Sequence, residues 1–209
     1  MTDRPRIWNT NFTDKTINGR NIDFHVDRPP LDYIHEFRRH DPAERDQAPD
    51  YIFFNLSGLR EDYKRKLPDI FTITGGLIVI SERFADLLRG FELGQTRLFE
   101  VPLFERDQKT PRPGRWFILH IAAKKSAFVP EASSGVKEKD HAPPGLWEPD
   151  RLVKTDVVAV RASAAEGEDL WVDTHYSWRI FFSDRLRQAI KEAGIKGSNF
   201  VLRPCIVVD

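Results

Sequence analysis

Two serine motifs are the best-defined chemical candidates in the sequence: Ser-Glu-Arg at positions 81–83 and Ser-Asp-Arg at positions 183–185. A serine placed there could act as a nucleophile if a neighbouring base activated it. Serine is also preferred at a helix N-cap, where its hydroxyl accepts from free backbone N–H groups, and the acid that follows it suits the positive end of the helix dipole. No histidine lies at a telling position beside either motif, so we predict that Ser81 and Ser183 are structural helix caps.

The other residue types that support catalysis or metal binding lack a diagnostic arrangement. Among the six histidines, His35 and His40 lie five residues apart, off a single helix face, and His120 lies in an apolar run where a hydrogen-bonded core position is the simpler interpretation. Glycine-rich phosphate loops and the motifs G-x-S-x-G, H-E-x-x-H and C-x-x-C are absent from the sequence. The single cysteine, Cys205, excludes an internal disulfide and a cysteine-rich zinc site. The sequence therefore predicts no catalytic residue, no cofactor and no metal site.

Acidic side chains cluster around a tryptophan in the last quarter of the chain. Paired carboxylates could bind a divalent cation or serve as acid and base, but the spacing of a calcium-binding loop is absent, and clustered charges in loops are usually solvated. Acidic residues beside an aromatic anchor suit a basic protein partner instead. We therefore predict a partner-binding face that comprises Glu166, Glu168, Asp169, Trp171, Asp173 and Trp147. The alternative for both tryptophans is that each covers the hydrophobic core.

The composition is that of a globular protein, with 209 residues, 40% hydrophobic and 31% charged. Lys and Arg number 32, as do Asp and Glu, and this zero balance argues against a nucleic-acid binder and an electrostatic membrane anchor. No apolar run approaches the ~20 residues of a membrane helix. No hydrophobic segment follows residues 1–5, so we expect no signal peptide, and the lone cysteine fits a reducing compartment. We expect a cytoplasmic protein without nucleic-acid or membrane partners.

The elements that must position these residues are short strands and short helices. Apolar runs predict strands at 51–54, 71–74, 77–80, 97–104, 115–122, 157–160, 170–172, 178–182 and 200–208. Helical spacing predicts a helix over 31–40 and two more that begin at Ser81 and Ser183. The strand at 115–122 is apolar on both faces, which is typical of a central strand. Gly75 and Gly76 predict a two-residue hairpin turn, and residues 129–150 predict a long surface loop.

The segments that begin at residues 78 and 180 resemble each other. Each runs from a strand through serine, an acid and arginine into an apolar stripe, and Ser183 lies 102 residues after Ser81. An internal duplication and convergence on one physical unit explain this equally well. The pattern predicts an α+β fold with a mixed, mostly antiparallel sheet. Residues 1–67 are predicted to be a polar, loop-rich region packed on or leading into the core, and residues 68–209 the main α+β domain.

Five short motifs point to a known family: Pro68–Phe71, Ile80–Phe84, Trp171–Asp173, Phe181–Leu186 and Ala189–Gly194. They resemble a bacterial immunity-protein family of polymorphic toxin systems, formerly a domain of unknown function. The resemblance covers about residues 68–209. It implies an α+β, non-enzymatic domain that binds and neutralises a cognate toxin protein, and it supplies no catalytic residues. A hydrolase-like enzyme that reverses toxin damage and a structural or assembly partner are the alternatives. The toxin, its contact surface and the oligomeric state stay open.

Overall fold

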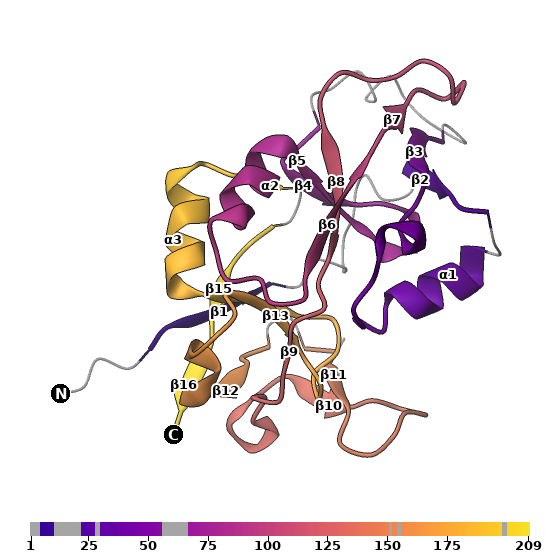
Figure 1. Cartoon of the computed structure of the whole chain (residues 1–209). Helices are drawn as coiled ribbons and strands as arrows, with labels where there is room; N and C mark the ends of the chain where they lie inside the picture. Colours follow the sequence, from indigo (N-terminus) through magenta and orange to yellow (C-terminus); the bar gives the residue numbers. More distant parts are fainter. Residues whose placement is uncertain are drawn as a thin grey trace.

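A computed structural model of the chain describes residues 5–10, 22–27, 30–55, 67–150, 152–153, 156–197 and 200–209. Three α-helices lie in this part: α1 (Pro30–Phe37), α2 (Glu82–Arg89) and α3 (Asp184–Glu192). Short strands, mostly antiparallel, account for most of the other regular structure (Figure 1), so the predicted α+β class is confirmed. Within the described residues, no helix combines the length and the apolar character that a membrane crossing requires.

Two similar sheets form the centre of the molecule. The first has the order β4-β5-β8-β6, with bounds Ile70–Thr72, Ile78–Ser81, Trp116–His120 and Arg97–Val101. The second has the order β15-β1-β14-β13-β9, with bounds Arg203–Pro204, Ile7–Thr10, Ile180–Ser183, Leu170–Asp173 and Lys124–Lys125. Strand β8 lies between the antiparallel neighbours β5 and β6, which confirms its predicted central position.

The two central sheets repeat one arrangement. In each, an antiparallel pair leads through a capping serine into a helix, β4-β5-α2 in one half and β13-β14-α3 in the other. The next strand is β8 in the first sheet, where Trp116 is paired with Ser81, and β1 in the second, where Ile7 is paired with Ser183. Strand β8 follows its helix in the chain, whereas β1 precedes its hairpin. The halves therefore share an arrangement in space but not an order in sequence, and α2 and α3 lie side by side (Figure 1).

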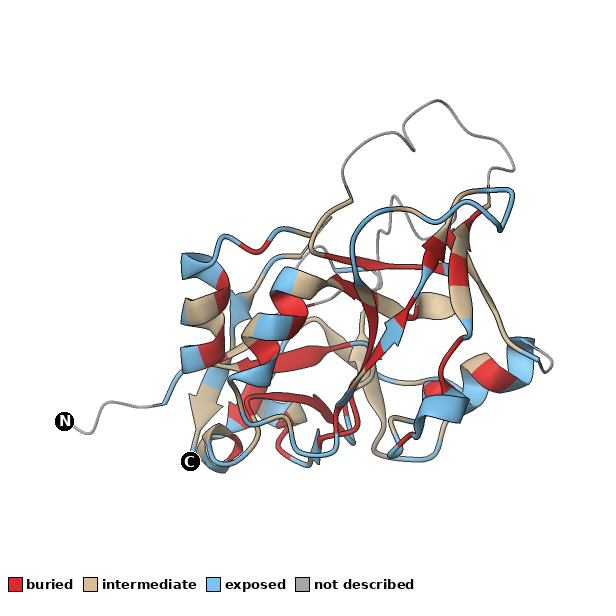
Figure 2. Ribbon diagram, turned by 45° about the horizontal axis from the view of Figure 1, so that its top comes forward, coloured by how far each residue is buried: buried red, intermediate tan, exposed pale blue. Residues whose placement is uncertain are grey.

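Alternation along the strands divides the core into three clusters. One cluster fills the space between the two helices α2 and α3 and one face of both central sheets, and it includes Leu119 and Phe182. The opposite face of the first sheet, including Ile118, packs against α1. The opposite face of the second sheet presents Trp171 and Phe181 to a third cluster. Figure 2 shows the consequence: the central strands are buried, while α2 and α3 expose their outer faces.

Three smaller sheets surround this centre. They are β2-β3-β7 (Ile22–His25, Tyr51–Phe54, Leu103–Phe104), β10-β11 (Val136–Glu138, Trp147–Pro149) and β12-β16 (Ala159–Arg161, Ile206–Val208). The predicted N-terminal region thus contributes β1 to a central sheet and α1, β2 and β3 to the packing on the other. Residues 1–4, 11–21, 28–29 and 56–66 of that region lie outside the described residues.

Three local predictions were wrong. Residues 129–150 contain the hairpin β10-β11, whose three-residue strands carry charges and proline and so lack an apolar alternation. The glycine pair is part of a longer connection, because Thr72 is paired with Ile78 and the intervening residues form a 3-10 turn. The predicted strand at 97–104 breaks at Pro102, which has no N–H to donate, and β7 then pairs with β3 in another sheet.

Candidate functional site

The hydroxyls of Ser81 and Ser183 are engaged in helix caps. Ser81 Oγ accepts from the backbone N–H three residues later at 3.4 Å and donates to Asp69 Oδ1 at 2.9 Å. Ser183 Oγ makes the same pair of bonds, accepting at 3.2 Å and donating to Asp169 Oδ1 at 2.5 Å. Each hydroxyl thus donates a hydrogen bond to a carboxylate and accepts one from the helix backbone. This geometry fits capping and leaves no histidine in place to activate either serine.

The acidic loop of the predicted partner-binding face is folded around Lys125. The Nζ atom of Lys125 donates to the backbone carbonyls of Ala164, Glu166 and Glu168 at 3.0, 2.6 and 3.0 Å. It also lies 3.7 Å from the Glu168 carboxylate. Burial lowers the pKa of the Lys125 ammonium, and the charges of Glu168 and Asp169 oppose that shift. Glu166 is exposed and Glu168 half-buried, so these two predicted acids reach the surface.

The other two acids of that face are buried and already bound. Asp169 is 1% exposed and accepts from Arg185 Nε at 2.6 Å and Nη2 at 2.5 Å. Burial raises the pKa of Asp169, but hydrogen bonds from Arg185 and Ser183 outweigh it and leave the pKa below its usual value. The Asp173 side chain is fully buried and accepts from three backbone N–H groups at 2.7, 3.0 and 2.8 Å. Both carboxylates hold the fold and have no surface to offer a partner.

Both predicted tryptophan anchors pack on the third core cluster. Trp171 has 0% of its surface exposed and stacks on Phe181, with centroids 5.8 Å apart. Lys125 Nζ lies 4.1 Å from the Trp171 ring centroid. Trp147 is half-buried, and its ring centroid lies 6.2 Å from that of Phe128. The burial removes Trp171 as an exposed anchor, because both faces of β13 are covered and all four of its residues are buried.

Ser126, His175 and Asp173 meet in an arrangement that superficially resembles a catalytic triad. Ser126 Oγ lies 3.0 Å from His175 Nδ1, and Asp173 Oδ1 lies 4.0 Å from the same nitrogen. A triad requires the serine and the aspartate on opposite nitrogens of the imidazole, so that one removes a proton while the other orients the ring. Because both groups face Nδ1 here, the arrangement does not activate Ser126.

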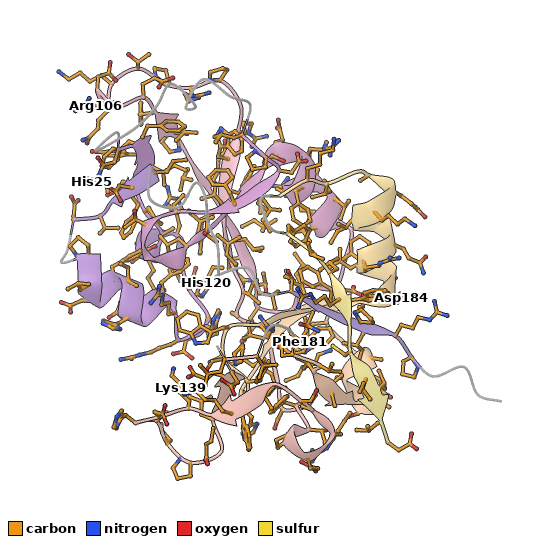
Figure 3. All side chains as sticks on the ribbon, turned by 180° about the vertical axis from the view of Figure 1, so that it is seen from behind. His25, Arg106, His120, Lys139, Phe181 and Asp184 are labelled. Atoms are coloured by element: carbon orange, nitrogen blue, oxygen red, sulfur yellow. The ribbon has the colours of Figure 1, made fainter. Side chains whose placement is uncertain are left out.

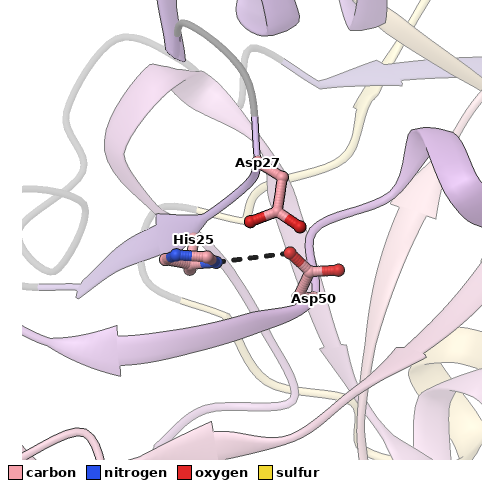
Figure 4. A group of neighbouring side chains, drawn as sticks. All are labelled: His25, Asp27 and Asp50. Atoms are coloured by element: carbon pink, nitrogen blue, oxygen red, sulfur yellow. Dashed lines mark hydrogen bonds and ion pairs between the residues drawn. The ribbon is translucent and has the colours of Figure 1, made fainter.

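A second cluster, His25, Asp27 and Asp50, lies where β2 meets β3 (Figure 4). Its potential ligand atoms lie within 4.8 Å of one another, and His25 Nδ1 is 3.2 Å from Asp50 Oδ2. The His25 ring stacks on Tyr51 with centroids 4.7 Å apart. The side chains of His25 and Asp50 are 43% and 55% exposed, so water competes with any ion. We interpret the cluster as surface pairing that supports the two strands.

His120 is the last residue of β8, and His40, three residues after α1, lies beside it. Both are bound to backbone carbonyls. His120 Nε2 is 2.6 Å from the Asp41 carbonyl oxygen, and His40 Nδ1 is 2.7 Å from the Ile121 carbonyl oxygen. Burial lowers the pKa of both imidazoles, that of His40 to about 4. Both are therefore neutral at pH 7 and serve packing, which agrees with the core interpretation of His120.

These histidines form part of the wall of a cleft of about 650 Å³. Five segments line it: the end of α1 and the residues after it, residues 76–78 at the start of β5, the stretch from the end of β8 to Lys124, the connection between β13 and β14, and the connection between β10 and β11. In Figure 3, which shows the molecule from behind, His120 and Lys139 lie on the side that carries α1. The volume is within the range of ligand-binding clefts.

The cleft carries an excess of positive charge. Five cationic side chains line it: Arg38, Arg39, Lys124, Lys139 and Arg179. Among its described lining residues the only acid is Asp173, whose carboxylate is buried and bound. Lys124 and Arg179 pair with carboxylates outside the lining, at 2.7 and 2.5 Å. Arg38, Arg39 and Lys139 have no carboxylate partner in the described part of the chain, so their charges are available.

Trp178 lies close to two cations of the lining, Arg38 and Lys139. Arg38 Cζ is 5.8 Å and Lys139 Nζ 5.7 Å from its ring centroid. The side chain is 38% exposed, and its φ of 68° is in the left-handed region. The cleft could not be predicted from the sequence because its residues come from segments about 40 and 100 positions apart, as Trp178, Lys139 and Arg38 show. The one available signal was the tryptophan between a serine and an arginine. The predicted strand at 178–182 included Trp178, but β14 begins only at Ile180.

The comparison with known families agrees with the resemblance found in the motifs. A profile of the Immunity protein family (Imm11) matches residues 28–202. This span begins upstream of Pro68, where the motifs start, and it includes α1, both central helices and the residues of the cleft. No curated protein matches the chain. Because the match covers most of its length, this chain belongs to the Imm11 immunity protein family.

Proposed function

We propose that this chain protects its cell by binding a cognate toxin protein directly and blocking it. The observation that carries the proposal is the Imm11 family match over residues 28–202. The proposed mechanism is occupancy: the toxin is inactive while the complex exists, and no covalent chemistry takes place. The bonding of the candidate catalytic groups supports this mechanism over repair, because Ser81 and Ser183 cap helices and His40 and His120 bind carbonyls.

The contact surface is a separate part of the proposal. The acidic loop offers Glu166 and the half-buried Glu168, while the remaining residues of the predicted face are buried or packed on the core. The cleft offers an exposed tryptophan and, beside it, Arg38 and Lys139, which have no carboxylate partner among the described residues. Interfaces draw most of their binding energy from a few such central aromatic and arginine anchors. We therefore place the toxin contact at the cleft rather than at the acidic loop.

We also propose that the complex forms in the cytoplasm. The chain has one cysteine, Cys205, and burial raises the pKa of its thiol to about 12. A thiol that stays protonated is a poor nucleophile and a poor partner for disulfide exchange. This cysteine usage is typical of a reducing compartment. The implied toxin then acts on a cytosolic target, and detection of the chain in the periplasm contradicts this part of the proposal.

Direct binding is tested with the purified toxin domain encoded beside this chain's gene. We expect one stable complex in a sedimentation experiment, and calorimetry should give a single binding event with a fixed stoichiometry. The affinity should be the same for fresh toxin and for toxin that has already turned over substrate and released the product, because a blocker recognises the toxin itself. Protection of cells without any measurable complex contradicts the proposal and favours repair of the toxin's product.

A further inference from the structure

We propose that the cleft around Trp178 receives an acidic segment of the toxin, whose carboxylates pair with Arg38 and Lys139 while an adjoining side chain packs on the indole. This inference rests on the proposed function, because it assumes a protein partner. It adds the chemistry of that partner's contact segment. The support comes from the backbone at Trp178, the charges of the lining, and one buried guanidinium.

The backbone at Trp178 is held in a conformation that a bulky residue avoids. A φ of 68° is in the left-handed region, where a side chain with a Cβ is disfavoured by about 1 kcal/mol or more. Four described residues other than glycine have such a φ, and two of them, His40 and Trp178, line this cleft. Local strain of this kind is retained where the surrounding structure fixes it, and functional sites are where it accumulates. A glycine or asparagine would fit the backbone better, so the tryptophan side chain itself has a use here.

The charges of the cleft indicate the sign of its occupant. The chain as a whole is neutral, with 32 basic and 32 acidic residues, so a lining with five cations and one buried acid is a local concentration. Arg38 and Lys139 both lie close to the Trp178 ring centroid, at 5.8 and 5.7 Å, and neither is neutralised by a described carboxylate. Surfaces that meet in a complex are arranged so that opposite charges face each other. The partner's segment is therefore acidic.

Arg179, next to Trp178, adds unused hydrogen-bond donors to the same wall. Its side chain is 3% exposed, and Nη2 donates to Asp156 at 2.5 Å. Its Nε and Nη1 atoms are buried and have no hydrogen-bond partner among the described residues. Buried donors are almost always satisfied, so an unsatisfied pair calls for an explanation. Because both atoms are buried, a carboxylate beside Trp178 would supply the acceptor only after the guanidinium turned toward the cleft.

The test compares toxin affinities of single variants by calorimetry. Trp178→Gly, Arg38→Glu and Lys139→Glu are the cleft variants. We expect Trp178→Gly to weaken binding about thirtyfold or more, as for a central aromatic anchor, and each charge reversal to weaken it about tenfold. Added salt should weaken wild-type binding and have a smaller effect on Lys139→Glu, because screening acts on the charges that the variant has lost.

The controls lie outside the cleft: one makes the same charge reversal, one truncates an exposed apolar side chain, and one changes the acidic loop. Lys191→Glu reverses an exposed charge on α3, Leu152→Ala removes a side chain that is 93% exposed, and Glu166→Lys probes the acidic loop. We expect all three to bind within about threefold of wild type. Thermal unfolding of every variant separates loss of binding from loss of fold, and Trp178→Gly should stay folded because glycine suits its φ.

A second measurement needs no variant of the chain and adds charged peptides to the wild-type protein. Hexaglutamate should compete with the toxin and shift the indole N–H resonance of Trp178, whereas hexalysine should do neither. If the toxin binds wild type but tolerates all three cleft changes within threefold, or if hexalysine competes instead, the inference is overturned while the proposed function stands. If the toxin does not bind wild type at all, the proposed function itself fails.

Discussion

Asp69 and Asp169 occupy equivalent positions in the two halves of the molecule, and each binds the loop that follows the other half's helix. Asp69 exchanges two bonds with Lys196 after α3: its N–H donates to the Lys196 carbonyl at 2.7 Å, and its Oδ2 accepts from the Lys196 N–H at 2.9 Å. Asp169 makes the same exchange with Glu92 after α2, also at 2.7 and 2.9 Å. Since each aspartate also holds a capping serine, the reciprocal bonds tie the two halves together.

Asparagine substitutions should affect the two aspartates unequally. Asp169 is 2% exposed at its side chain and Asp69 18%, so loss of the Asp169 charge leaves a more deeply buried polar site. We expect Asp169→Asn to lower the free energy of unfolding by about 3 kcal/mol and Asp69→Asn by about 1 kcal/mol. Urea denaturation measures both. The exposed Asp86→Asn is the control and should be silent; equal losses at positions 69 and 169 would contradict the burial argument.

Alanine at either capping serine distinguishes a structural helix cap from a catalytic nucleophile. Ser81→Ala and Ser183→Ala each remove an acceptor for a helix N–H, and each should cost ~1 kcal/mol of unfolding free energy. Toxin neutralisation by the folded variants should be unchanged. A Ser81→Ala variant of full stability that no longer protects cells would instead support a catalytic serine.

Trp171→Ala tests the role of the buried tryptophan. The side chain is fully buried and stacked on Phe181, so its truncation should leave a cavity and cost about 3–5 kcal/mol of unfolding free energy. The remaining folded protein should bind toxin with wild-type affinity, because Trp171 reaches no surface. Calorimetry corrected for the folded fraction decides; weakened binding by a stably folded variant would restore Trp171 to the interface.

Stability should fall in mild acid through His40. The pKa of His40 is lowered by burial from 6.5 to about 4, so below pH 6.5 the unfolded chain binds a proton that the folded chain excludes. The contribution of His40 to the free energy of unfolding is complete above pH 6.5 and decreases as the pH falls toward 4. It amounts to at most about 3 kcal/mol. Denaturation at several pH values compares wild type with His40→Asn, which suits the φ of 57° and should lose this part of the pH dependence. His141→Asn, exposed at φ 58°, is the control and should retain it.

The sequence predicted what depends on neighbouring residues and missed what depends on distant ones. The caps at Ser81 and Ser183 and the central strand around Ile118 follow from local spacing, and all three are present. The partners of the caps were not predictable, because Asp69 and Asp169 lie 12 and 14 residues from their serines. The cleft around Trp178 was missed for the same reason. Trp171 lies between Leu170 and Val172 in a predicted strand, but the cations near Trp178 come from distant segments that only the tertiary fold brings together.

Protection by occupancy fixes how much of the chain is needed for a given amount of toxin, and a titration of toxin activity measures that ratio. Increasing amounts of the purified chain are added to a fixed amount of the toxin, and residual toxin activity is measured. The toxin concentration is kept far above the dissociation constant of the complex. We expect a linear fall in activity that ends near one binding-site equivalent. Complete protection at a small fraction of an equivalent would contradict it, since only a catalyst that turns over could protect at that ratio.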